Sequence, residues 1–243
     1  MQIVQHLRTY TRGRRKLRFQ HFIADLRCGE RPLRIIDIGG TVPFWTRWWG
    51  LREEDGLHVT LVNDHIQDDT DDEDSNVPFL ANLRTDATTL TEDDFSQYDC
   101  VFSNSCVEHL ATWRDQMRMA RTIMGSRLPY FVQVPNKFAP IDPHYPRPYV
   151  PFFGAYPKEV QRRLLTVSAL GSGGRHTYAS AGELLTYYNP LGPEDMRRLF
   201  PDAEVVVERP MGVPMSILAI RTKARVTRPE AATLLHPVAM GAA

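Results

Sequence analysis

A short apolar stretch that ends in two glycines is the part of this chain that points most directly to chemistry. Residues 33–38 are rich in β-branched side chains and run straight into Gly39 and Gly40. An apolar run this short, followed by turn residues, predicts a buried β-strand. Because glycine has no side chain, such a turn lets the backbone come close to a bound ligand. An ordinary tight turn has the same pattern, so both interpretations stay open.

Polar side chains at the ends of the first two expected strands add to this pattern. An unpaired buried carboxylate is costly, so we expect Asp37 to orient the glycine turn through backbone amides or to meet a positive group of a ligand. The second strand, over residues 58–62, ends in Asn63 and Asp64. In nucleotide-binding α/β sheets the residue at this place commonly binds ribose hydroxyls. An amide can do so without charge assistance, so either residue could serve.

The elements that must position these residues alternate between strands and helices. Aromatic residues fill a proline-started helix over 43–49, where they either wall the ligand or pack on the sheet. The last two expected strands, over residues 204–208 and 216–221, are predicted to form a reversed hairpin. Strands are further expected before Arg84 and over 98–103, 130–134, 204–208 and 216–221, and helices over 2–27, from about 107 through 124, and over 158–165, 183–188 and 193–200.

Three segments resemble class I S-adenosylmethionine-dependent methyltransferases of the type 11 kind. The run Asp37-Ile38-Gly39-Gly40-Thr41 resembles motif I of that family and lacks the three-glycine spacing of a dinucleotide fingerprint. The pair Asp86-Ala87 resembles the family's Asp-Ala element. Residues 99–110 are similar to its Asp-x-Val-x-Ser-x-x-x-x-Glu-His-Leu segment, which is the more specific match. The resemblance covers roughly residues 30–221.

The resemblance implies S-adenosylmethionine as the cofactor and assigns roles to the matching residues. The Asp86 carboxylate would take the adenine amino group, and the Ala87 amide would meet a ring nitrogen. The backbone near Ser103 and Asn104 would accept from the methionine amino group. Methyltransferases usually place an acid where this chain has Asn63, so the ribose contact is where the chain departs from the family.

The fold implied is α/β, a Rossmann-like, seven-stranded and mostly parallel sheet with helices on both faces. A proline-dense stretch after the fifth strand excludes a long helix or inner strand there and predicts a cap insertion. We expect one methyltransferase domain over residues 1–243. Its parts are an N-terminal helical arm (1–30), a cofactor-binding core (31–134), a substrate cap (135–190), a final helix and hairpin (191–221) and a loosely held tail (222–243).

Two histidines lie where the acceptor of a methyl group would bind. Methyl transfer to an alcohol must also remove a proton, which calls for a base with a pKa near neutrality. We predict His144, in the proline-dense loop, as this base and His109 as the second candidate. Asp142 is close enough in sequence to orient a ring nitrogen of His144. A purely structural, hydrogen-bonded role remains the alternative for each histidine.

The favoured acceptor is a hydroxyl of a sugar or other small polar metabolite. Aromatic residues of the cap could stack on a sugar: Tyr145, Tyr149, Phe152, Phe153 and Tyr156. Length and cap also resemble actinobacterial sugar O-methyltransferases of polymethylated polysaccharide synthesis. The chain lacks the Asn/Asp-Pro-Pro-aromatic element of nucleobase amino methylation and the Pro-Cys nucleophile of cytosine methylation. An RNA methyltransferase that uses the basic N-terminal helix, and a non-catalytic cofactor-binding partner protein, remain alternatives.

Bulk composition narrows the remaining classes. The 243 residues carry 29 Lys and Arg against 29 Asp and Glu, so no net field attracts nucleic acid or a membrane surface. The arginines and lysines of residues 8–18 form a basic cluster. We interpret this cluster as a solvated helix face or a lid over an anionic group, in preference to a nucleic-acid-binding arm. The three cysteines lack the spacing of a metal site. The acidic run over residues 68–74 is expected to be an exposed loop. We therefore predict no metal site. We expect a cytoplasmic protein with no membrane span; the oligomeric state stays open.

Overall fold

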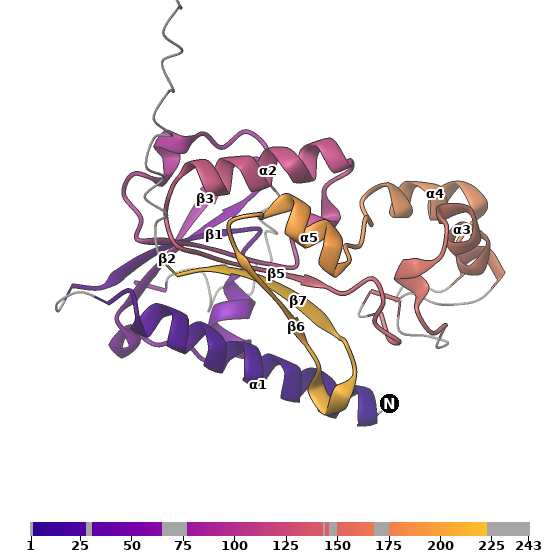
Figure 1. Cartoon of the computed structure of the whole chain (residues 1–243), viewed down its shortest axis with the longest axis horizontal. Helices are drawn as coiled ribbons and strands as arrows, with labels where there is room; N and C mark the ends of the chain where they lie inside the picture. Colours follow the sequence, from indigo (N-terminus) through magenta and orange to yellow (C-terminus); the bar gives the residue numbers. More distant parts are fainter. Residues whose placement is uncertain are drawn as a thin grey trace, which may run out of the picture.

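The computed structural model describes residues 2–27, 31–64, 77–142, 144–145, 150–167 and 175–222. Seven strands form a single sheet in the order β3-β2-β1-β4-β5-β7-β6 (Figure 1). Only β7 runs against its neighbours, because it pairs antiparallel with both β5 and β6, whereas the other pairs are parallel. The strands are β1 (Leu33–Ile38), β2 (Leu57–Asn63), β3 (Leu80–Arg84), β4 (Cys100–Asn104), β5 (Tyr130–Pro135), β6 (Glu204–Glu208) and β7 (Ser216–Arg221).

Helices cover both faces of this sheet. In Figure 1, α1 (Gln2–Ala24) lies under one face, and α2 (Trp113–Gly125) and α5 (Pro193–Leu199) lie over the other. Successive strand residues point to opposite faces, so Ile35 packs with the α1 side and Ile36 with the α2 side. This alternation of buried side chains on both faces confirms the predicted Rossmann-like, mostly parallel sheet.

The segment between β5 and α5 has a small apolar core of its own. It contains α3 (Lys158–Val167) and α4 (Tyr178–Thr186), which lie beside the sheet in Figure 1. The buried members of this core are Tyr145, Phe153, Leu165, Ala181, Leu185 and Tyr188. Helix α4 begins five residues before the predicted start, because the Thr177 hydroxyl accepts from the Ser180 amide and caps the helix there. The predicted role of this segment as a substrate cap stays a prediction.

The aromatic segment after β1 differs from the predicted helix. It forms a five-residue π-helix, Phe44–Trp48, in which the Trp49 amide donates to the Phe44 carbonyl at 3.1 Å. Trp45 is fully buried and packs edge-on against Phe19 of α1 and Phe102 of β4. The rings therefore serve mainly to join α1 to the sheet.

The predicted helix from 107 through 124 is broken in two. A 3₁₀ turn, Val107–His109, is separated from α2 by three residues. The break occurs because the Thr112 hydroxyl accepts from the Asp115 amide at 3.2 Å, which starts a new helix at Trp113. Strand β4 likewise starts later than predicted, since the Asp99 carboxylate accepts from the Arg34 amide and pairs with Arg31.

Across the described parts of the chain, no helix combines the length and apolar character needed to cross a membrane. The acidic run over 68–74, Tyr149 and nearly all of the predicted tail lie outside the described residues.

Candidate functional site

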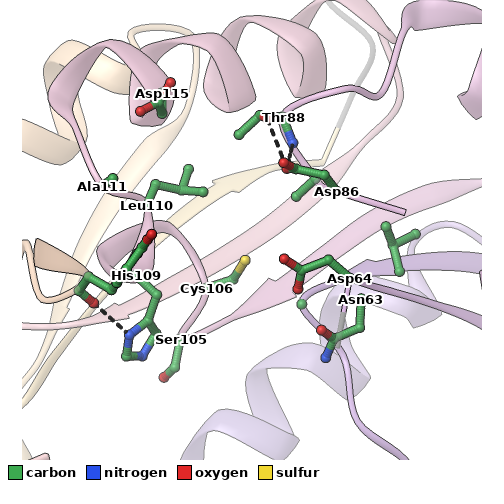
Figure 2. Close-up of a pocket in the computed structure, with 14 residues that line it drawn as sticks. Asn63, Asp64, Asp86, Thr88, Ser105, Cys106, His109, Leu110, Ala111 and Asp115 are labelled. Carbon is green, nitrogen blue, oxygen red and sulfur yellow. Dashed lines mark hydrogen bonds between the residues drawn. The ribbon is translucent and has the colours of Figure 1, made fainter. Parts of the chain in front are cut away.

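A cavity of about 680 Å³ opens where the carboxyl ends of β1, β2 and β4 meet (Figure 2). Parallel strands bring their carboxyl ends to one edge of the sheet, so residues far apart in sequence converge there. Asp64, Asp86 and Cys106 point toward the middle of this cavity in Figure 2. The full lining is Gly39, Val62, Asn63, Asp64, Asp86, Ala87, Thr88, Ser105, Cys106, His109, Leu110, Ala111, Asp115 and Tyr187.

Gly39 lies in the turn after β1, at a place where no side chain would fit. Its φ is +81°, a conformation that side chains rarely adopt, and a Cβ there would lie 2.6 Å from the Cys106 Cβ and Sγ atoms. Any larger residue would push into Cys106 and reduce the cavity. The glycine is therefore required by both the backbone and the space.

Asp86 is held rigidly at the rim of the cavity. Its Oδ1 atom accepts from the Thr88 amide at 2.7 Å and from the Thr88 hydroxyl at 2.8 Å (Figure 2). These two contacts make an Asx turn. The turn fixes the direction of the carboxylate without help from other elements.

Several of the predicted cofactor-binding side chains do not line the cavity. Asp37 lies beneath the turn, where its Oδ2 atom accepts from the Trp45 indole Nε1 at 2.7 Å. The partner is therefore an indole, and not the backbone amides or positive ligand group expected from sequence. Burial raises the pKa of Asp37 to about 7, although the Trp45 hydrogen bond lowers it in part. Gly40 packs directly on this carboxylate.

Other predicted residues brace the strand ends. The Ser103 hydroxyl donates to the Ile38 carbonyl at 2.9 Å and ties β4 to β1. The Asn63 amide donates to the Gly40 carbonyl at 3.3 Å. The Asn104 side chain accepts from Arg15 of α1 at 2.8 Å. The cavity lining does not include Gly40, Thr41, Ser103 or Asn104. A ligand would have to extend beyond this cavity to contact them.

The two predicted histidines meet, although 34 residues separate them in the sequence. His109 Nε2 and His144 Nε2 lie 3.2 Å apart. His109 Nδ1 is 3.0 Å from the Tyr187 carbonyl oxygen, and His144 Nδ1 is 3.1 Å from Asp142 Oδ1, the contact expected from sequence. A carbonyl oxygen can only accept, so His109 Nδ1 carries a hydrogen and its Nε2 carries a lone pair.

Charges around the pair set its titration. Burial lowers the pKa of His109, and repulsion by a protonated His144 lowers it further, against the Tyr187 hydrogen bond. Burial alone would raise the pKa of Asp142, but hydrogen bonds and charge attraction from His144 and a hydrogen bond from the Tyr188 hydroxyl outweigh it, so the pKa falls. Asp142 is thus a stable anion beside His144.

Glu108 is a functional candidate that sequence reasoning did not single out. It is fully buried, and neither carboxylate oxygen has a hydrogen-bond partner among the described residues. Burial raises its pKa to about 7, and the Asp142 anion adds to this. Attraction from His144, the dipole of its own backbone amide and attraction from Arg15 act in the opposite direction. A ligand atom of Glu108 and one from each of His109 and His144 lie within 4.8 Å of one another. Its sequence signal was its place beside His109, within the segment 99–110 that resembles the methyltransferase family.

The basic cluster of α1 makes contacts within the molecule. The Arg12 guanidinium lies 4.0 Å from the Trp48 ring centre, and Arg15 pairs with the buried Glu208 at 3.6 Å. Arg18 pairs with the same carboxylate at 3.6 Å, and Lys16 donates to the Trp49 carbonyl. These contacts dock α1 against the sheet and its π-helix.

The chain matches no protein-family model and no curated protein. Solved structures resemble its fold. An O-methyltransferase family protein from Burkholderia thailandensis is 10% identical, with 85% of this chain and 57% of that one covered and a TM-score of 0.46. This chain therefore spans less than two thirds of that protein.

Two further structures are matched over more of their own length. A putative S-adenosylmethionine-dependent methyltransferase from Listeria monocytogenes is 13% identical, with 84% and 96% covered and a TM-score of 0.48. A protein from Rhodobacter sphaeroides described as a putative zinc-dependent alcohol dehydrogenase is 16% identical, with 83% and 87% covered and a TM-score of 0.47. Likeness at this level assigns neither activity nor ligand to this chain.

Proposed function

We propose that this chain is an S-adenosylmethionine-dependent methyltransferase that acts on a hydroxyl of a small polar acceptor, with a sugar favoured. The observation that carries the proposal is the convergence of Gly39, Asp64 and Asp86 on one cavity that His109 also lines. In open α/β sheets, nucleotides bind at this edge, outside the carboxyl ends of the strands. The cavity volume of about 680 Å³ lies in the range of small-molecule and cofactor sites.

The residues present fit the cofactor. The Asp86 carboxylate would accept from the adenine amino group, and the Ala87 amide would meet a ring nitrogen. Asn63 or Asp64 would bind the ribose hydroxyls, and the space beside Gly39, which a side chain would fill, would admit the methionine end. Bound there, the sulfonium supplies the methyl group, and the protein's task is alignment and exclusion of water.

The histidine pair would remove the acceptor's proton. As the acceptor oxygen bonds to the methyl carbon and the carbon–sulfur bond breaks, the hydroxyl proton passes to a ring nitrogen. We place His144 as this base, because the Asp142 anion 3.1 Å from its Nδ1 stabilises the charge that the ring acquires. The nearby His109 Nε2 lone pair could share that proton. His109 remains the second candidate for the base.

Calorimetry with S-adenosylhomocysteine tests the cofactor site. Loss of a charge-assisted hydrogen bond costs about 1.5–3 kcal/mol, so Asp86→Ala should weaken binding roughly ten- to a hundredfold. Asp86→Asn is the matched control for the turn. The side-chain carbonyl oxygen of Asn can still accept from Thr88, but its NH₂ group cannot replace the second carboxylate oxygen as an acceptor. Gly39→Val should abolish binding. Unchanged affinity in both Gly39→Val and Asp86→Ala would refute this placement.

Turnover with an acceptor found by screening sugars and small alcohols tests the chemistry. His144→Ala should lower the rate by ~10²–10⁴-fold, the range for a positioned base, while S-adenosylhomocysteine affinity stays nearly constant. His109→Ala should have a milder effect. The reverse order would exchange the two roles. If neither substitution changes the rate, the acceptor needs no base and the hydroxyl assignment is wrong.

The contacts of Arg12, Arg15 and Arg18 within the molecule support packing of α1 over nucleic-acid binding. Gel shifts with RNA and DNA at physiological salt should show no tight binding. Tight binding with a steep salt dependence would favour the nucleic-acid alternative instead.

A further inference from the structure

We propose that Glu108, His109 and His144 bind one divalent transition-metal ion at the edge of the cavity. That the ion binds follows from the geometry of these side chains alone. Its consequence for methyl transfer rests on the proposed function. The three residues come from two separate places in the fold, the 3₁₀ turn after β4 and the segment after β5, which the tertiary structure brings together.

The spacing of the two ring nitrogens fits a shared ion. His109 Nε2 and His144 Nε2 are 3.2 Å apart. Two nitrogens that each lie about 2.0–2.1 Å from one ion, the usual Zn–N distance, and are separated this way subtend an angle of about 100° at the ion. This angle falls between the octahedral and tetrahedral values, so both rings could bind without moving.

The far side of each ring is already held as in a metal site. His109 Nδ1 donates to the Tyr187 carbonyl, and His144 Nδ1 faces the Asp142 carboxylate. Metal-binding histidines almost always give their other N–H to such an oxygen, which fixes the tautomer and aims the remaining nitrogen at the ion. Here both rings have this outer partner, and both Nε2 atoms are aimed at the same region.

Glu108 is the observation that points independently to a ligand. A buried carboxylate without a hydrogen bond is costly, and both oxygens of Glu108 lack a partner among the described residues. One of these oxygens lies within 4.8 Å of the ligand atoms of both histidines. A cation bound between the three groups would provide the missing partner, which would explain why an acid is tolerated there.

The ligand set selects the class of metal. Two imidazoles and one carboxylate suit Zn²⁺, Mn²⁺, Fe²⁺, Co²⁺ or Ni²⁺, whereas Mg²⁺ and Ca²⁺ prefer oxygen ligands. Three protein ligands leave room for a further ligand, as in catalytic sites. Because His109 lines the cavity, that position would be at its edge, where the acceptor hydroxyl is placed. A metal-bound nitrogen cannot accept a proton, so the role of His144 as base applies to the metal-free protein. With the ion bound, the cation itself would ease loss of the hydroxyl proton to solvent.

The test uses the untagged full chain, stripped with a chelator and titrated with Co²⁺ and Zn²⁺ by calorimetry. We expect one high-affinity site in the micromolar range or tighter, a visible Co²⁺ absorption band, and little binding of Mg²⁺. His109→Ala, His144→Ala and Glu108→Gln should each weaken Zn²⁺ binding by roughly tenfold or more. His58→Ala, a change at an exposed histidine on β2, is the matched control and should bind as wild type does.

Binding that is absent, or that stays unchanged in all three ligand variants, would overturn the proposal. Circular dichroism shows that each variant is folded, and S-adenosylhomocysteine titration of the same metal-free samples separates the two proposals. If S-adenosylhomocysteine binds and the metals do not, the metal site is refuted and the proposed function stands. If the metals bind as expected and S-adenosylhomocysteine does not, the metal site stands and the methyltransferase assignment is refuted.

Discussion

Two carboxylates at the ends of neighbouring strands are equally buried but differ in their hydrogen-bond partners. Asp37 at the end of β1 and Glu108 in the turn after β4 are both essentially inaccessible, and burial raises the pKa of each to about 7. One oxygen of Asp37 accepts from the Trp45 indole, whereas neither oxygen of Glu108 has a partner among the described residues.

This difference separates a structural acid from an acid placed for a ligand. Asp37 is enclosed by Trp45 and Gly40, and so helps to hold the turn. Glu108 faces two histidines whose ring nitrogens point at the same region. Changes around Asp37 should therefore affect mainly stability, and changes at Glu108 should affect mainly binding.

The largest effect should come from Gly40→Ala. A Cβ at Gly40 would lie 2.5 Å from Asp37 Cγ and 2.9 Å from Leu61 Cδ2, in a core with no room to move. We expect a loss of about 3 kcal/mol or more in the free energy of unfolding, measured by urea denaturation. Gly13→Ala in α1 is the control, since a Cβ there meets nothing within 4 Å. Equal stability of Gly40→Ala and wild type would show that Asp37 is not tightly enclosed.

The next largest effect concerns pH. Both carboxyls have a folded pKa of about 7, above their ordinary values of 3.8 and 4.5. Between those values and pH 7 the folded state binds more protons than the unfolded state, so stability falls as pH rises through this window. Each pKa unit is worth about 1.4 kcal/mol, so each carboxyl accounts for roughly 3–4 kcal/mol at most. Asp37→Asn should remove part of this slope in urea denaturation from pH 4.5 to 8; an unchanged slope would contradict the assignment.

A smaller effect should follow from Trp45→Phe. The substitution keeps a ring in the core but removes the indole N–H that donates to Asp37. Leaving a buried acceptor unpaired costs about 1–3 kcal/mol, which thermal or urea unfolding can measure. Trp49→Phe changes a ring in the same cluster without removing this donor, and should cost less. If both substitutions lower the free energy of unfolding equally, the hydrogen bond contributes no stability beyond that of ring packing.

At pH 4.5, where the buried Glu108 carboxyl is protonated in the folded state, Glu108→Gln in the metal-free protein should change stability least, by less than about 1 kcal/mol. The substitution replaces a buried carboxylate that has no described partner with a neutral amide of the same shape. The contrast should appear when Zn²⁺ is added, because a ligand at a hundred times its Kd stabilises by about 2.7 kcal/mol. Wild type should gain that stability in thermal unfolding and Glu108→Gln should not. An equal gain in both would remove the distinction between the two acids.

Much of the fold could be predicted from the sequence, because burial in a sheet leaves a local pattern. The predicted bounds of β1, β6 and β7 match the structure, and the ends of β2, β4 and β5 differ from the predicted ones by at most two residues. Glycine after β1 and polar residues after β2 and β3 were expected at the ligand edge, and Gly39, Asn63, Asp64, Asp86 and Ala87 do line the cavity. Strand direction and strand ends are enough for that prediction.

Tertiary structure alone decided which side chains meet. No local sequence pattern shows that the Trp45 indole, in the π-helix, donates to Asp37. Nor does any such pattern show that a new helix starts after Thr112 and leaves Glu108 and His109 in a separate 3₁₀ turn. The 3.2 Å contact of His109 with His144 depends on how the segment after β5 folds back over the sheet edge. Periodicity records whether a residue is buried, but the partner of a buried polar group depends on packing between segments distant in sequence.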